Sequence, residues 1–176
     1  MSDKKIAYYV YEFAGILAAS VIAVAVIFTL FFKISVVNGT SMLDTLHNGD
    51  RLIITAHDFN ISQGDIIISS QPNAYEKILV KRVIAVGGQT VDFVNGEVLI
   101  DGKAIDEPYL SEGIRTYRGD LPEGTITVPE GMLFVMGDNR MISADSRKNG
   151  VGFIDERYIV GQAVYRIGDS KLLGGN

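Results

Sequence analysis

The strongest constraint in the sequence is a long apolar run near its beginning. Residues 14–32 read AGILAASVIAVAVIFTLFF, which is 19 consecutive residues without a charge or a proline. About 20 apolar residues span the hydrocarbon core of a bilayer. The run therefore predicts one transmembrane helix over 14–33, preceded by a short segment, 1–13, and followed by a separate domain, 34–176.

Two other interpretations of this run fit its length and pattern less well. A cleaved targeting segment has an apolar region of about 7–15 residues and then a small-x-small site, and neither fits here. A buried core helix is normally apolar on one face only, whereas this run is apolar all round. Lys4 and Lys5 precede the run, so the positive-inside rule favours a cytoplasmic N-terminus and an extracytoplasmic domain after the single span.

The remainder of the chain is typical of β structure. Short segments rich in Val, Ile, Tyr and Phe alternate with turn signals such as Asn95-Gly96 and Asp101-Gly102. We therefore expect an all-β domain of antiparallel sheets with eight or more strands, and a small cap insert near 102–124, where charge, glycine and proline are more frequent. The predicted strands are 51–55, 65–70, 77–86, 90–94, 97–100, 125–128, 132–137 and 158–167.

Composition excludes several classes of function. The chain has no cysteine, so a thiol nucleophile, a thiolate metal site and a disulfide are impossible. Only two histidines are present, His47 and His57, which leaves no multi-histidine metal site. The net charge of −5 argues against nucleic-acid binding, which requires a broad basic face. We expect no metal, no cofactor and no nucleic acid.

Three short segments of the domain carry candidate chemistry. The first contains Gly39-Thr40-Ser41-Met42, close behind the apolar run, although a lone loop serine is more often a turn residue. The second is Lys81, which has aliphatic neighbours on both sides in a predicted strand. Such a lysine either lies at an edge and reaches water, or is buried, in which case desolvation lowers its pKa and makes it a base.

The third segment is the polar stretch that begins at residue 137. It combines several glycine, carboxylate, amide, hydroxyl and guanidinium groups within eleven positions, a density that suits either a polar network around a tight turn or a solvated loop. Asp145 and Arg147 have the spacing and chemistry for a bidentate ion pair. The residues of interest are Gly137, Asp138, Asn139, Arg140, Ser143, Asp145, Ser146 and Arg147.

Together, in this order and behind an anchor, the three segments resemble type I signal peptidases. These are membrane-bound serine proteases that remove signal peptides from exported precursor proteins, and the single span is similar to the Gram-positive type. The motifs are G-x-S-M, a strand with K-R-V, and G-D-N-R-x-x-S-x-D-S-R-x-x-G. The resemblance implies two antiparallel β regions, related to those of self-cleaving repressors, secretory precursors as substrates and the cell membrane as location.

The resemblance also implies roles for individual residues. Ser41 would be the nucleophile and Lys81 its general base. Gly39 and Met42 would border the oxyanion and substrate site. Ser143 would orient the lysine, Asp145 and Arg147 would brace the site, and the remaining members of the third motif, Gly137, Asp138, Asn139 and Arg140, would shape the adjoining loop.

Two departures from the family pattern and three rivals stay open. Asp44 stands where the family usually has proline, and Gly39 stands where some members have a serine that assists the oxyanion. The rivals are a non-catalytic anchored β domain that binds partner proteins, a serine enzyme that uses His47 or His57, and a soluble self-cleaving repressor, against which the anchor argues.

Overall fold

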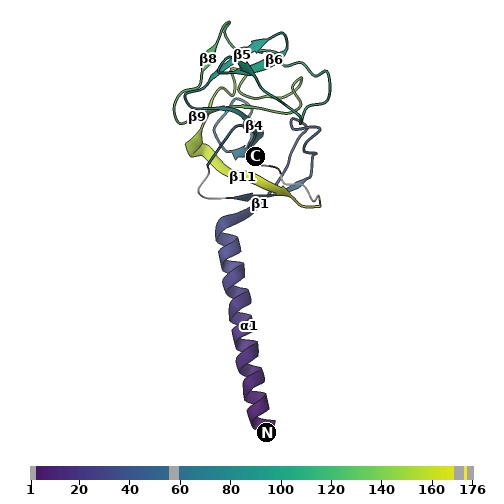
Figure 1. Cartoon of the computed structure of the whole chain (residues 1–176), viewed down its shortest axis with the longest axis vertical. Helices are drawn as coiled ribbons and strands as arrows, with labels where there is room; N and C mark the ends of the chain where they lie inside the picture. The colour runs from purple at the N-terminus through teal and green to yellow at the C-terminus, as the bar shows by residue number, and fades with distance from the viewer. Residues whose placement is uncertain (1–2, 56–59, 169–172, 174–176) are drawn as a thin grey trace.

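The chain consists of one long helix and a β-rich body. The computed structural model describes residues 3–55, 60–168 and 173. Helix α1, Asp3–Phe31, projects from the body, and strand β1, Phe32–Val36, continues directly from its end (Figure 1). A search of the described residues for helices long and apolar enough to cross a membrane finds one span, Lys5–Phe31, whose apolar window is not buried against the body.

The larger sheet has seven strands in the order β1-β2-β11-β3-β4-β9-β10, and every neighbouring pair is antiparallel. Strand β4 lies inside this sheet and pairs with β3 on one side and with β9 on the other. The strands that follow β1 are β2, Arg51–Thr55; β3, Ile66–Ser69; β4, Leu79–Val86; β9, Met132–Met136; β10, Ile154–Asp155; and β11, Ile159–Arg166.

The smaller sheet lies at the end of the body away from α1, as β5, β6 and β8 show in Figure 1. Its order is β7-β6-β5-β8, again antiparallel throughout. The strands are β5, Thr90–Val94; β6, Glu97–Ile100; β7, Lys103–Ala104; and β8, Ile126–Thr127. A short 3-10 helix, Glu156–Tyr158, precedes β11 in the larger sheet.

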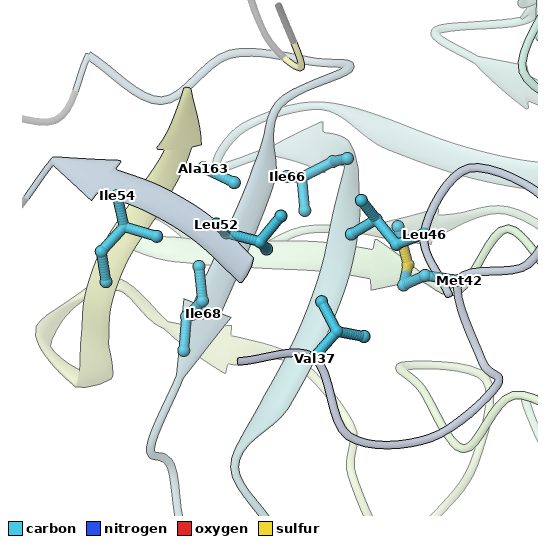
Figure 2. Close-up of a cluster of buried hydrophobic side chains, with 8 residues drawn as sticks. All are labelled: Val37, Met42, Leu46, Leu52, Ile54, Ile66, Ile68 and Ala163. Atoms are coloured by element: carbon cyan, nitrogen blue, oxygen red, sulfur yellow. The ribbon is translucent and has the colours of Figure 1, made fainter. Parts of the chain in front are cut away.

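Buried aliphatic side chains hold these layers together. One cluster joins β2, β3 and β11 to the loop after β1, and its eight members are shown in Figure 2. A second cluster contains Ile84 and Phe134 from the larger sheet and Val91 and Val98 from the smaller one, so it binds the two sheets to each other. The polar loops of the site are thus attached to a continuous apolar interior.

The predicted antiparallel β fold is confirmed, with eleven strands in the described part of the chain. Asn95-Gly96 and Asp101-Gly102 form the turns that flank β6, and all four residues have the positive φ that these dipeptides favour. The sequence did not predict β1, because Phe32 and Lys33 read as the end of the apolar run. Pairing with β2 makes this segment a strand, and α1 ends at Phe31.

Candidate active site

Ser41 lies in a loop between β1 and β2 whose shape is fixed by burial and by backbone hydrogen bonds. Met42 and Leu46 are almost fully buried in the first apolar cluster, which anchors the loop on both sides of its first turn (Figure 2). Gly39 adopts φ +113°, a conformation that favours glycine, and its N–H donates to Asn48 Oδ1 at 2.8 Å. Ser41 is left partly exposed at the top of this loop.

Lys81 reaches Ser41 from β4, an interior strand of the larger sheet. Its Nζ lies 2.8 Å from Ser41 Oγ and 2.9 Å from the Val80 carbonyl oxygen. Lys81 is only 4% exposed, and no carboxylate of the described residues lies within ion-pair distance of it. Burial lowers the pKa of Lys81 to about 8, although the more distant Asp145 and Asp138 act in the opposite direction.

The loop after β9 holds the loop that carries Ser41 in place. The Asn139 N–H donates to the Ser41 carbonyl at 3.0 Å, and Asn139 Nδ2 donates to the Thr40 carbonyl at 3.2 Å. Gly137 has no room for a side chain, because a Cβ there would lie 2.3 Å from both the Ser41 carbonyl oxygen and Ser143 Oγ. Two residues of the G-D-N-R motif therefore act on the backbone around Ser41.

Asp145 and Arg147 form a buried bidentate ion pair behind this loop. Arg147 Nε and Nη2 donate to the two carboxylate oxygens at 2.9 and 2.8 Å. Asp145 also accepts from the Gly137 N–H at 3.1 Å, and Arg147 donates to the Arg140 carbonyl at 2.9 Å. The pair therefore braces both ends of the Gly137–Arg140 turn.

Ser143 and Ser146 differ in their hydrogen bonding. Ser146 Oγ accepts from the Val135 N–H at 2.9 Å. Ser143 Oγ is buried beside Gly137, and among the described residues it has no hydrogen-bond partner. The hydrogen bond to Lys81 that the resemblance implies for Ser143 is not formed in this structure, in which Lys81 donates to Ser41 and Val80 instead.

Sequence reasoning set Arg82 aside as a base and gave it no structural role, yet it is nearly as deeply buried as Lys81. Arg82 Nε and Nη2 donate to the two oxygens of Asp138 at 2.9 and 2.7 Å. Its guanidinium stacks 3.8 Å from the centre of the Tyr109 ring, and Thr45 Oγ1 donates to Asp138 at 2.6 Å. These contacts explain the position of Asp138 and connect the loop that carries Ser41 with the 102–124 segment.

A second ion pair attaches the same segment to the site. Arg140 donates to both carboxylate oxygens of Glu107, at 3.2 and 2.5 Å, and to Thr116 Oγ1 at 2.6 Å. Tyr109 donates to Glu107 at 2.7 Å, and burial raises the pKa of the Tyr109 hydroxyl. Glu107, Tyr109 and Thr116 had no recognisable signal in the sequence, because their partners are distant along the chain.

Two cavities border the loop that carries Ser41. The one beside Lys81, which we call the lysine cleft, has a volume of about 260 Å³ and is lined by the Val37–Met42 segment, the Leu79–Lys81 edge, Ile142 and Ala144. The other, which we call the Asp44 pocket, has a volume of about 220 Å³ and lies between Leu43–Asp44, the 109–114 segment and Asp138–Met141.

The histidine alternative gains nothing from this arrangement. His47 is exposed and makes no hydrogen bond with Ser41, whose hydroxyl is held by Lys81. His57 lies outside the described residues. Among residues 3–55, 60–168 and 173, no group of three or more histidine or acidic side chains is arranged to hold a metal ion.

An antiparallel β body that brings a partly exposed serine against a buried lysine at the mouth of a cleft is typical of hydrolases that act through a serine. The family model described as "Signal peptidase, peptidase S26" matches residues 10–167, and the chain belongs to this family. It is therefore a serine peptidase, and the activity of the family is the removal of signal peptides from secretory precursors.

Several relatives are similar over nearly the whole chain. "Signal peptidase I" of Bacillus licheniformis is 36% identical over 167 residues, which cover 88% of this chain and 87% of that protein. "Signal peptidase I" of Bacillus amyloliquefaciens is 39% identical over 160 residues, 84% of this chain and 81% of that protein. A crystal structure of a signal peptidase I from Enterococcus faecalis V583 gives a TM-score of 0.49 at 31% identity, covering 60% of this chain and 97% of that one.

Proposed function

We propose that this chain is a membrane-anchored serine endopeptidase that cleaves signal peptides with Ser41 as nucleophile and Lys81 as general base. The observation that carries this proposal is the 2.8 Å contact between Lys81 Nζ and Ser41 Oγ, made by an amine that is buried and has no carboxylate partner in the described chain. A buried amine without a counter-charge loses its proton readily, and the neutral amine then accepts the proton of a neighbouring hydroxyl.

The lowered pKa supports a supply of free base at physiological pH. With a pKa of about 8, about a tenth of the Lys81 side chains are neutral at pH 7. An ordinary exposed lysine would be neutral roughly 300 times less often. Arg82, the next residue, cannot replace it because a guanidinium does not deprotonate in proteins.

The reaction then proceeds through an acyl-enzyme. Lys81 takes the proton of Ser41 Oγ, which bonds to the carbonyl carbon of the scissile peptide. The Ser41 N–H has no acceptor in the described structure and is a suitable donor to the oxyanion. As the C–N bond breaks, Lys81 returns the proton to the leaving amine. A water molecule, activated by the Lys81 amine, then hydrolyses the ester to Ser41 and releases the signal peptide.

The lysine cleft is suited to an extended peptide with small side chains. Pairing between β4 and β9 begins at Arg82, so along Leu79–Lys81 only the edge that faces β3 carries a ladder partner. A substrate strand adds to such a free edge through its main chain. The adjoining walls include Met42 and Ala144, which leave shallow space for residues such as alanine on the acyl side of the cut.

Helix α1 supports anchoring in the membrane. Its apolar surface is not covered by the rest of the protein, which is costly in water and favourable in lipid. Ser41 follows Phe31 by ten residues, so it lies within at most about 35 Å of the helix end along the chain. Lys4 and Lys5, which precede the uncharged run 14–32, favour a cytoplasmic N-terminus and an extracytoplasmic active site.

The proposal is tested on a purified precursor that carries an A-x-A cleavage site. Ser41→Ala, Lys81→Ala and Lys81→Arg should each lower cleavage by at least roughly a hundredfold, because a positioned general base contributes about 10² to 10⁴ in rate. Lys103→Ala, at an exposed lysine in β7, is the matched control and should retain activity. If Lys81→Ala or Lys81→Arg cleaved the precursor as fast as the wild type, the role assigned to Lys81 would be contradicted. If the wild-type protein cleaved no precursor at all, the alternative of a non-catalytic binding domain would be favoured.

A further inference from the structure

The Asp44 pocket and the lysine cleft are formed by the same two loops. Ser41 and Met42 line the cleft, and the next two residues, Leu43 and Asp44, line the pocket. Likewise, the Asn139–Met141 turn lines the pocket, whereas Ile142 lines the cleft. The hydrogen bond from the Asn139 N–H to the Ser41 carbonyl joins the two loops between the cavities. Ser41 therefore lines the lysine cleft two residues before the loop begins to line the Asp44 pocket.

An extended peptide that is cut at Ser41 must continue on both sides of it. Under the proposed function, the acyl half lies along the free edge of β4 in the lysine cleft. The residues after the scissile bond then continue beyond Ser41, and the next residues of the same loop, Leu43 and Asp44, line the Asp44 pocket.

The charges around the Asp44 pocket do not cancel. Arg140 is paired with Glu107, and Arg82 is paired with Asp138, so each of these two cations already has its carboxylate. The Asp44 carboxylate accepts a hydrogen bond from Ser111 Oγ at 2.8 Å, and in the described part of the chain it has no cationic partner. One uncompensated negative charge therefore remains at the mouth of the pocket.

The walls beside this carboxylate are apolar. Leu43 and Ile114 line the pocket, and Met141 projects at its rim with 69% of its surface exposed. A lysine or arginine side chain has matching chemistry, because its methylene stem lies on apolar surface while its charged end reaches a carboxylate. A glutamate in the same position would meet Asp44 as a like charge.

We infer that the Asp44 pocket binds the first residues of the mature protein, on the leaving side of the scissile bond, and that Asp44 makes it select basic over acidic side chains there. This inference rests on the proposed function. It assigns to Asp44, the residue that departs from the proline of the family motif, a part in substrate choice.

The test uses the full-length protein in neutral detergent and a set of peptides that share one A-x-A site. Lysine or glutamate is placed singly at the first, second or third position after the cut, and kcat/KM is measured for each. For at least one position the lysine peptide should be cleaved roughly two- to fivefold faster than the glutamate peptide, as expected for an exposed ion pair. The preference should decrease in high salt.

Variants then locate the preference at Asp44. Asp44→Asn retains an acceptor for Ser111 and should remove the lysine-to-glutamate ratio, whereas Asp44→Lys should invert it. Glu97→Gln, at an exposed carboxylate in β6, is the matched control and should leave the ratio unchanged. A wild-type ratio near one at all three positions, or a ratio that Asp44→Asn preserves, overturns the inference while leaving signal-peptide cleavage intact. Absence of cleavage for every peptide would instead overturn the proposed function.

Discussion

The two faces of β4 treat two adjacent cations in opposite ways. Lys81 and Arg82 are both buried, at 4% and 6% exposure, and their side chains leave the strand on opposite sides. Lys81 meets a hydroxyl and a carbonyl oxygen but no carboxylate within ion-pair distance in the described chain. Arg82 meets the carboxylate of Asp138 bidentately and the face of Tyr109.

This difference suits Lys81 to proton transfer and Arg82 to holding segments of the fold together. An uncompensated buried amine is costly, and it reduces the cost by giving up its proton, which is what a general base requires. A guanidinium does not release its proton, so its burial demands a carboxylate, and the resulting pair connects distant segments. One strand thus places a reactive group on one face and a structural ion pair on the other.

The largest expected effect comes from breaking the Arg82 side. Asp138→Asn leaves a buried guanidinium without its counter-charge, and the free energy of unfolding should fall by about 3–5 kcal/mol. Urea unfolding at pH 7 measures this loss. Asp120→Asn breaks a largely exposed pair with Lys148 and should cost less than about 1 kcal/mol. Equal losses in the two variants would mean that the Arg82 pair has no special structural weight.

Lys81→Met, which removes the amine on the other face of β4, should raise the unfolding free energy at neutral pH, and this gain should shrink as the pH rises. The folded pKa of Lys81, about 8, lies below its ordinary 10.5, so folding is penalised below pH 8 and the penalty is relieved as pH rises towards 10.5. Between pH 7 and pH 10 the wild type should therefore gain roughly 2–3 kcal/mol of unfolding free energy relative to Lys81→Met. A difference between the two proteins that stays constant with pH would mean that Lys81 is not perturbed.

The rate of cleavage should follow the same group. If neutral Lys81 is the base, kcat/KM should rise about 50-fold between pH 6 and pH 8 and level off above about pH 9. Asp138→Asn should move the midpoint to lower pH, because the Asp138 carboxylate favours the charged amine. A profile with its midpoint near pH 6.5 would indicate a histidine instead.

A smaller effect is expected from Gly137, in the turn that contacts the loop of Ser41 and includes Asp138, the partner of Arg82. In Gly137→Ala the new Cβ would lie 2.3 Å from the Ser41 carbonyl oxygen and from Ser143 Oγ, so the protein should lose about 1–3 kcal/mol of stability. The displaced nucleophile should lower kcat by about a hundredfold. Adding Ser143→Gly removes one of the two contacts and should restore part of the stability but little of the rate. Full recovery of the rate would show that the contact with Ser41 is unimportant.

The elements with strong local patterns were predictable from the sequence. The strands that became β2–β6, β8, β9 and β11, the glycine turns around β6 and the apolar span each depend on residues that are close together in the chain. Strand β1 was not predicted, because its pairing with β2 overrides a hydropathy pattern that continues from the helix. The same local reading marked Lys81 as an unusual strand lysine, whereas Ser41 drew attention only through the motif of the resembled family, and neither signal gave a distance between the two residues.

The contacts that buried side chains make around the site were not predictable from the sequence. Arg82 appeared to be an ordinary strand residue, and its partners, Asp138 and Tyr109, are 56 and 27 positions away in the chain. The lysine hydrogen bond that the family pattern implies for Ser143 is not made in this structure, because Lys81 is satisfied by Ser41 and by its own strand.

By itself, the order of amino acids determined the apolar helix, the alternation of short strands and turns, and the presence of a serine and a strand lysine in a chain without cysteine. Only the folded structure decided that this lysine is buried without a carboxylate partner in the described chain, whereas the neighbouring Arg82 is paired with Asp138. The reason is that hydropathy and turn preference act between neighbours along the chain, whereas the charge state of a buried group depends on every segment packed around it.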